Sequence, residues 1–243
     1  GLRRLLSQSG RGARPDCVVL ADGFQHRRIA RDLDIVLIDA SRSPFIDRVL
    51  PAGWLREPVE GLARADLVVL THVELVDGAV IGSIDAGVRN LRGGRGLDAA
   101  TRHLWTGLIE GDAGRVRPLD ALLGARVVAS CAIGNPAGVL HSLRQTLGEA
   151  GELAGTLVLP DHDPSGREGV LTLARLASET RAGMIVVTDK DWSKLRRYPA
   201  ETWGGVPIIR PRLAMAFERG APGLEARVLE AASRAGGARG AAR

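Results

Sequence analysis

The chain has 243 residues, of which 45% are hydrophobic, and its formal net charge is +5. This length allows one large domain or two modest ones. No apolar run is long enough for a transmembrane helix, no signal peptide is present, and the two cysteines, Cys17 and Cys131, form neither a disulfide framework nor a metal-binding pair. Membrane-spanning and disulfide-rich classes are therefore excluded, and both cysteines are predicted to be small core residues.

Arginine supplies nearly all of the positive charge, because Lys190 and Lys194 are the only lysines. A genome biased towards arginine codons explains this as well as an anionic partner does, whether that partner is a phosphate group or an acidic membrane surface. Only 3% of the residues are aromatic, and no nucleic-acid-binding motif is present. Nucleic acid is therefore not expected as a partner.

Short apolar runs that end at polar residues predict buried parallel strands in the first part of the chain. Such runs lie at 17–20, 34–38 and 67–70, and each is rich in β-branched residues. A short helix is expected at 59–63 and a longer one over 80–91. This alternation is typical of an α/β unit.

A β-hairpin is predicted in the middle of the chain, where expected strands 102–109 and 115–119 flank the turn residues 110–114. A second α/β pattern follows it. Strands are expected at 126–131, 155–159, 184–188 and 206–210. Helices are expected at 136–150, 165–182, 192–196 and 223–232, with a frayed tail after the last. Strand–helix–strand alternation predicts right-handed crossovers and parallel sheets, so the expected fold class is α/β.

The run Asp22-Gly23-Phe24-Gln25-His26-Arg27-Arg28 directly follows the first expected strand. A carboxylate at the carboxyl end of a buried parallel strand lies where open α/β sheets bind ligands. There Asp22 can hold Mg²⁺ or accept a proton from a substrate hydroxyl, and Arg27 can bind phosphate. A strand-ending turn with solvated arginines explains the same pattern.

Four other polar segments are candidates for binding or catalysis. The loop at 50–58 has two prolines and a glycine around Trp54, and its Arg56 can contact phosphate, although a rigid connector explains it as well. In the segment 160–164, His162 lies between two aspartates and can act as a general base, and a capping turn is the alternative.

The remaining two segments also follow expected strands. Backbone amides at 134–136 can receive an anion, and an ordinary capping turn accounts for them equally well. Lys190, in the segment 188–191, lies between two acids, so it is either a ligand-binding residue or part of a surface ion pair.

Taken together, these segments closely resemble the tetraacyldisaccharide 4'-kinase family. The resemblance rests on an ordered set of motifs between positions 22 and 191, which is more specific than any single member. The motifs are the runs at 22–28 and 31–39, Leu-Pro-x-Gly-x-Leu-Arg-Glu-Pro at 50–58, Ala-Arg-Ala-Asp at 63–66, Ala-Ile-Gly-Asn-Pro at 132–136, Pro-Asp-His at 160–162, and Thr-x-Lys-Asp at 188–191.

The resemblance implies a phosphotransferase that uses ATP and Mg²⁺. Its members transfer the γ-phosphate to the 4'-hydroxyl of a tetraacylated disaccharide 1-phosphate, giving lipid IVA, at the cytoplasmic face of the inner membrane of Gram-negative bacteria. The implied catalytic acid is Asp22, also a candidate Mg²⁺ ligand, with His162 as the residue that tunes it. The implied substrate- and phosphate-binding residues are Gln25, His26, Arg27, Arg56, Asn135 and Lys190.

The resemblance also implies how the chain is divided. Residues 1–100 are expected to be the later part of a P-loop-kinase-like α/β/α domain, which is incomplete here. Residues 101–120 are expected to form a two-stranded linker, and 121–243 a second α/β/α domain.

Two departures from the family pattern bear on activity. Members usually have two acids before Gly-Phe-Gln-His, and here the first position holds Ala21, which is expected to weaken metal or nucleotide binding. No Gly-x-x-x-x-Gly-Lys-Ser/Thr phosphate-binding loop occurs in the chain, whereas members carry one upstream. Because the chain begins at Gly1 rather than Met, upstream residues are expected, and the chain alone is expected to have little or no kinase activity.

Two other functions compete with that of a kinase. A catalytically dead lipid- or nucleotide-binding relative stays open as the alternative. A dinucleotide-binding enzyme of unrelated chemistry is disfavoured, because no Gly-x-Gly-x-x-Gly follows an expected strand.

Overall fold

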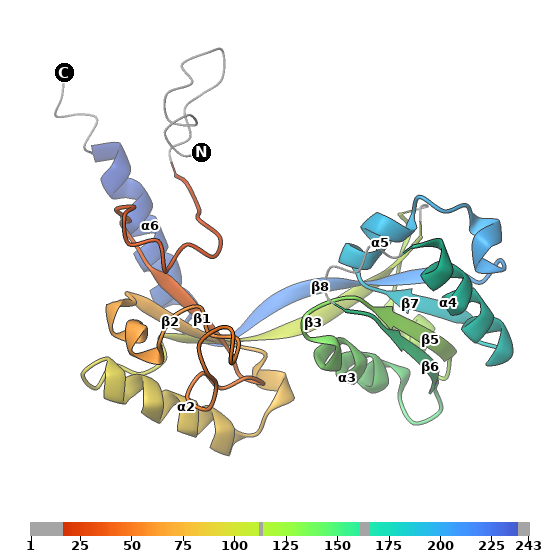
Figure 1. Ribbon diagram of the computed structural model, residues 1–243, viewed down its shortest axis with the longest axis horizontal. Coiled ribbons are helices and arrows are strands. Elements are labelled where there is room, and N and C mark those ends of the chain that lie inside the picture. Colours follow the sequence, from red (N-terminus) through yellow and green to blue (C-terminus); the bar gives the residue numbers. More distant parts are fainter. Residues whose placement is uncertain (1–16, 112–113, 161–165, 238–243) are drawn as a thin grey trace, which may run out of the picture. The chain divides into compact units, whose positions relative to one another are not determined.

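The computed structural model of the chain describes residues 17–111, 114–160 and 166–237, which fall into two units (Figure 1). Unit 1 lies within residues 1–102 and 217–243, and unit 2 within residues 103–216. Helices alternate with mostly parallel strands in both units, so the predicted α/β class is confirmed.

Unit 1 contains a parallel sheet in which β2 lies between β1 and the start of β3. Its elements are β1 (Ile35–Asp39), the 3-10 helices η1 (Val59–Arg64) and η2 (Val73–Leu75), β2 (Leu67–Thr71), α2 (Gly78–Leu91), the first residues of β3 (Ala99–Glu110), the last residues of β8 (Ile208–Arg219), and α6 (Ala221–Gly237). All five residues of β2 are buried, as expected for a parallel strand covered on both faces.

Helix α2 covers one face of this sheet. It begins after the N-cap Asp77, whose carboxylate accepts a backbone N–H of the first turn at 2.9 Å. Ile84 and Val88 of α2 are buried in one core cluster with Val68 of β2. This packing forms the core between α2 and the sheet of unit 1.

Asp85 of α2 gives unit 1 a pH-dependent contribution to stability. Burial alone would raise the pKa of its carboxyl, but the Leu97 backbone N–H at 2.7 Å and Arg89 Nε at 2.8 Å outweigh it and lower the pKa below the ordinary 3.8. Because the pKa of Asp85 is lower in the folded protein, its carboxylate stabilises the fold at pH values above the pKa of the unfolded state. This contribution is lost as the pH falls through the pKa of the folded state.

We therefore expect Asp85→Asn to lower the free energy of unfolding by about 1 kcal/mol at pH 7, because the charge-assisted hydrogen bond to Arg89 is lost. The difference from wild type should shrink as pH falls from 3.8 through the lower pKa of the folded state, because the Asp85 carboxyl becomes protonated first in the unfolded and then in the folded wild-type protein. Urea unfolding of both proteins between pH 7 and pH 2.5 measures this. A difference that stayed constant over that range would contradict it.

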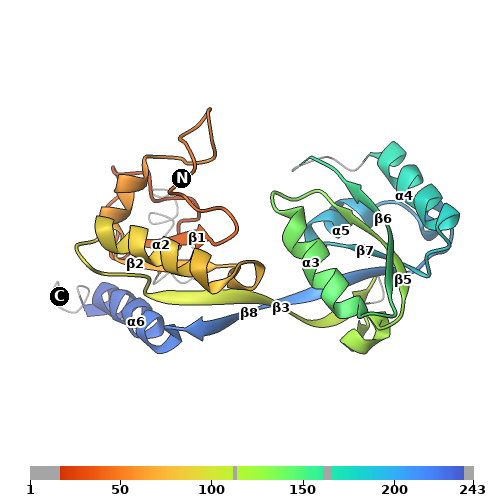
Figure 2. The ribbon, with the colours of Figure 1, turned by 90° about the horizontal axis from the view of Figure 1, so that it is seen from below.

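Unit 2 contains a parallel sheet with strand order β8-β7-β5-β6. Its elements are the rest of β3, β4 (Val116–Arg117), η3 (Leu119–Leu122), β5 (Arg126–Cys131), α3 (Pro136–Leu147), β6 (Glu152–Val158), α4 (Arg167–Glu179), β7 (Met184–Val187), α5 (Asp189–Leu195), η4 (Ala200–Trp203) and the first part of β8. Figures 1 and 2 show α3 on one face of this sheet, and α4 and α5 on the other.

The two faces of the unit 2 sheet form separate cores, because successive strand residues point to opposite sides. Val127 of β5 lies in a cluster with Leu143 of α3. The next residue, Val128, lies in the other cluster with Leu173 of α4 and Trp192 of α5. The central strand β5 is thus covered on both faces, and the segment 132–136 directly follows its carboxyl end.

Most of the predicted elements are confirmed. Strand β5 has the predicted bounds, and α2 begins two residues before the expected 80–91. The predicted hairpin is also present, because β3 and β4 pair antiparallel, with Leu108 opposite Arg117. Helix α6 continues to Gly237, so the prediction that it ends near 232 was too short.

The predicted strand at 17–20 is wrong. Those four residues have no regular secondary structure and are all exposed, and Cys17 is therefore not a core residue, although Cys131 is buried as predicted. Apolar β-branched residues become a strand only where a neighbouring strand pairs with them, and β1 pairs with β2 alone among the described residues. Asp22 therefore follows a segment without regular secondary structure rather than a strand of the sheet.

Candidate functional site

The loop 22–28 of unit 1 turns tightly at its start. Asp22 has a φ of 53°, in the left-handed region, and His26 donates its backbone N–H to Gly23 O at 3.0 Å. A Cβ at Gly23 would lie 2.9 Å from Leu20 Cβ, so the close turn requires glycine there. The side chain of Asp22 is 61% exposed, which leaves it accessible to a ligand.

Arg31 holds this loop in shape, a role that the sequence reasoning missed. Its guanidinium donates to the carbonyl oxygens of His26 at 2.7 Å, Gly23 at 3.3 Å and Phe24 at 3.4 Å. It also binds Asp34 through two hydrogen bonds, of 2.6 and 3.1 Å. Only the spacing of Arg31 and Asp34, three residues apart, hinted at this pair, and the carbonyl contacts follow from the folded loop.

The loops 22–28 and 50–58 meet in unit 1. Arg56 Nη2 lies 3.3 Å from Asp22 Oδ2, and Arg27 Nη2 lies 3.9 Å from Glu57 Oε2. Glu57 also accepts a hydrogen bond of 2.7 Å from Arg64 of η1. Three of the predicted site residues, Asp22, Arg27 and Arg56, are therefore brought together by these contacts.

Unit 1 also has an open depression of about 530 Å³ at the same loop. It is lined by Gln25, His26, Arg27, Arg28 and Ile29. Three of the predicted binding residues, Gln25, His26 and Arg27, thus lie on one surface. Two arginines beside an accessible carboxylate suit an anionic ligand that also offers a hydroxyl or a bound cation.

Unit 2 places Asn135 and Lys190 at the ends of neighbouring strands β5 and β7. Asn135 is the N-cap of α3 and accepts the Gly138 backbone N–H at 3.4 Å. Lys190 is exposed in the first turn of α5, which follows Thr188. The capping role that was the alternative for Asn135 is therefore present, and it is compatible with a binding role.

A buried carboxylate joins these two strand ends of unit 2. Asp191, 1% exposed, accepts the Ala132 backbone N–H at 3.1 Å and the Thr188 hydroxyl at 2.7 Å through Oδ2. Among the described residues its Oδ1 is buried without a hydrogen-bond partner. Burial, with this carboxylate nearby, raises the pKa of the Cys131 thiol to about 12, so Cys131 is an inert core residue.

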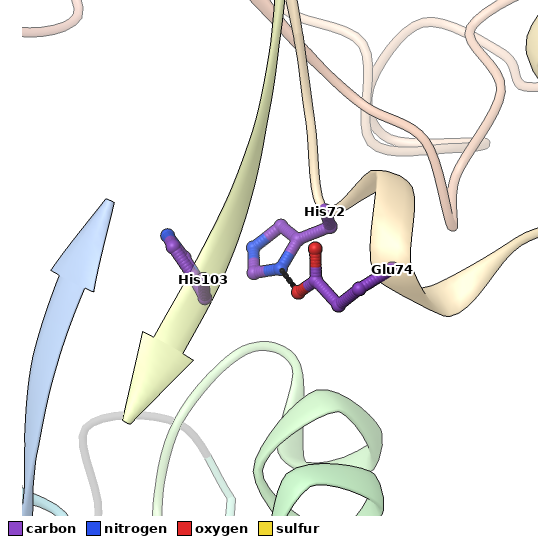
Figure 3. A group of neighbouring side chains, drawn as sticks. All are labelled: His72, Glu74 and His103. Carbon is purple, nitrogen blue, oxygen red and sulfur yellow. Dashed lines mark hydrogen bonds and ion pairs between the residues drawn. The ribbon is translucent and has the colours of Figure 1, made fainter. Parts of the chain in front are cut away.

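A carboxylate–imidazole pair follows the end of β2 in unit 1. Figure 3 shows the ring of His72 against Glu74, with His72 Nδ1 3.3 Å from Glu74 Oε1. His72 has a φ of 59°, and Glu74 Oε2 is buried without a hydrogen-bond partner among the described residues. This pair was not predicted from the sequence, because neither His72 nor Glu74 lies in one of the family motifs.

His162 lies outside the described residues, together with the rest of 161–165. The pairing of Asp22 with His162 therefore stays a prediction. The helix expected from 165 is present as α4, which begins at Arg167 with Gly166 as its N-cap.

Comparison with known proteins gives a match to one family. The family model described as "Tetraacyldisaccharide-1-P 4'-kinase" matches residues 1–231. A tetraacyldisaccharide 4'-kinase from Geobacter metallireducens is 38% identical over 181 residues, which are 74% of this chain and 49% of that protein. One from Anaeromyxobacter dehalogenans is 36% identical over 212 residues, or 87% and 54%.

A third relative with the same name, from Chlorobium luteolum, is 36% identical over 221 residues, which are 88% of this chain and 59% of that protein. The chain thus spans about half the length of the curated relatives that it matches.

Proposed function

Because the chain belongs to the tetraacyldisaccharide-1-phosphate 4'-kinase family, we propose that it is part of an enzyme that phosphorylates the 4'-hydroxyl of tetraacyldisaccharide 1-phosphate with ATP. The product is lipid IVA, an intermediate of lipid A biosynthesis. The observation that carries the proposal is the contact between two family motifs in unit 1, where Arg56 lies 3.3 Å from Asp22. This contact puts an accessible carboxylate beside guanidinium groups suited to phosphate.

In the proposed reaction Asp22, tuned by His162, accepts the proton of the sugar hydroxyl as the phosphate arrives. Arg27 and Arg56 bind phosphate oxygens, and Gln25 and His26 contact the substrate from the surface that they share with Arg27. Asn135 and Lys190 supply further polar contacts.

An ATP-dependent kinase needs a divalent metal to neutralise the charge that develops on the phosphates. Mg²⁺ is usually held by one or two carboxylates together with substrate phosphates. The accessible carboxylate of Asp22 fits this requirement, and it is the residue that would hold the ion. The position before it holds Ala21 rather than a second acid.

We also propose that the enzyme works at the cytoplasmic face of the inner membrane of Gram-negative bacteria, because its substrate is a lipid. Within the part of the chain that the structure describes, no helix has the length and apolarity needed to cross a bilayer. The association that we propose with this membrane is peripheral.

The 243-residue chain alone is expected to show little or no phosphotransfer, because its sequence contains no Walker loop to cradle the ATP phosphates. A complete enzyme, meaning this chain together with an upstream Walker-loop segment, is expected to be active. Transfer of radiolabel from [γ-³²P]ATP to the disaccharide in detergent micelles compares the two. Robust transfer by the chain alone would contradict this expectation.

The alternative, a non-catalytic lipid- or nucleotide-binding relative, is favoured by Ala21 alone. It predicts that the complete enzyme binds the disaccharide without transferring phosphate. Restoring the acid with Ala21→Asp then separates the two functions, since a gain of activity only in that variant would assign the loss to position 21.

A further inference from the structure

Residues 42–56 of unit 1 form a loop that keeps large apolar side chains in water. Ile46 is 88% exposed, Trp54 73% and Leu50 47%. A single exposed apolar side chain is ordinary on a protein surface. Three of them within one loop are a feature that more often marks a contact surface.

The backbone of this loop is held by its own hydrogen bonds. Leu50 N–H donates to Leu55 O at 2.9 Å, and Leu55 N–H donates to Arg48 O at 3.0 Å. A Cβ at Gly53 would lie 2.2 Å from Arg48 O, so the loop closes too tightly for any other residue there. The loop therefore has a closed backbone from which Ile46, Leu50 and Trp54 are exposed.

Phe45 anchors the loop to the core of unit 1. It packs against the core cluster beneath α2, and its ring occupies the space that a Cβ at Gly87 would need. Ile46, the next residue, is the most exposed of the apolar side chains of the loop. Phe45 therefore attaches the loop to the core, whereas its neighbour Ile46 is exposed to solvent.

The exposed charges of this loop are mainly positive. Arg42, Arg48 and Arg56 are all exposed, and the Arg42 guanidinium lies 5.4 Å from the centre of the Trp54 ring. The one acid between them, Asp47, turns its carboxylate towards the backbone N–H groups of the loop. Apolar and cationic groups are thus displayed together.

We propose that the 42–56 loop lies on the surface of an anionic phospholipid bilayer. Tryptophan is favoured at the level of the lipid headgroups, where its ring is buried and its N–H stays wet. Arginines beside it can keep their charge among anionic headgroups while their stems contact acyl chains. The inference rests on the proposed function, since it assigns the surface by which a lipid kinase approaches its membrane.

The chain itself can be tested with vesicles of phosphatidylcholine, with and without 30% phosphatidylglycerol, by co-sedimentation at low and physiological salt. Binding is expected to be strong only with the anionic lipid and to weaken as salt rises. Trp54 is the most exposed of the four tryptophans, because Trp192 and Trp203 are buried and Trp105 is partly buried, so it is the one expected to report insertion. Its emission should shift to the blue and be quenched by brominated lipid, and a Trp54→Phe variant should lose most of this signal.

Two variants test the two kinds of contact. Ile46→Ser with Leu50→Ser, and separately Arg42→Gln with Arg48→Gln, are each expected to lower the partition coefficient about tenfold. Leu123→Ser is the matched control, since Leu123 is 62% exposed in unit 2 and should not affect binding. These substitutions replace exposed side chains, so circular dichroism should show an unchanged fold.

Vesicle binding that is absent, or that both double variants leave intact, would overturn the proposal. So would light scattering that shows a dimer dissolved by Ile46→Ser, because the loop would then be a contact between two copies of the chain. Membrane binding does not require phosphotransfer. If the complete enzyme bound vesicles through this loop but transferred no phosphate, the proposed function would be refuted. The assignment of this loop as a membrane-binding surface would stand.

Discussion

Asp22→Ala and His162→Ala in the complete enzyme are each expected to lower kcat by about 10²–10⁴-fold, the range for loss of a general base. The Asp22 side chain is 61% exposed, and its ion pair with Arg56, at 3.3 Å, lies at the surface of unit 1. Asp22→Ala should therefore change turnover far more than it changes the thermal unfolding of the protein. Initial rates of phosphate transfer at saturating ATP measure the effect.

Matched controls separate this role from a general effect of lost charge. Asp32→Ala removes an exposed acid from the same part of unit 1, and His141→Ala removes an exposed imidazole from α3 of unit 2. Both are expected to keep kcat within about twofold of wild type. If Asp22→Ala and His162→Ala behaved like these controls, neither residue would belong to the mechanism.

The sequence predicted the sheets of both units well where apolar runs are buried on two faces. β5 is the clearest example, because five of its six residues are buried and its bounds match the prediction. The run at 17–20 has the same composition and is no strand, because strand formation also needs a neighbour with which to pair. Local sequence contains no information on that neighbour.

The candidate site was predicted as residue types but not as contacts. The motifs named Asp22 and Arg56, yet nothing in their spacing predicts that the two side chains lie 3.3 Å apart. Likewise Arg31 could be seen only as a motif residue, whereas the fold makes it the donor that shapes the 23–26 turn. Such contacts arise from how loops cross in space.

Arg92→Met is expected to lower the free energy of unfolding of unit 1 by about 3–5 kcal/mol, the cost of breaking a buried ion pair by removing one partner. The Arg92 side chain is 2% exposed and binds Asp98 Oδ2 at 2.7 Å. It also donates to the carbonyl oxygens of Asp66 and Gly96, both at 2.8 Å. One guanidinium thus ties the end of α2 to the starts of β2 and β3.

The large cost arises because methionine fills the space but leaves the negative charge of Asp98 without its buried cation and removes the donor to the Gly96 carbonyl. Denaturant-dependent hydrogen exchange of β2 peptides measures the stability of unit 1 separately from that of unit 2. Arg95→Met is the control, since it removes an exposed donor to the same Asp66 carbonyl, at 2.8 Å, and an ion pair with Asp98 at 3.8 Å. Because Arg95 is 61% exposed, these contacts should contribute only about 1 kcal/mol.

A double variant tests whether the charge of Asp98 causes the loss. Asp98→Asn keeps an oxygen to accept the Val68 backbone N–H, which Asp98 Oδ2 now accepts at 2.8 Å, but it removes the negative charge. Arg92→Met with Asp98→Asn should therefore be more stable than the sum of the single changes predicts, by about 1–3 kcal/mol. Strict additivity would mean that the two side chains act independently, and the carbonyl contacts of Arg92 alone would then account for its effect.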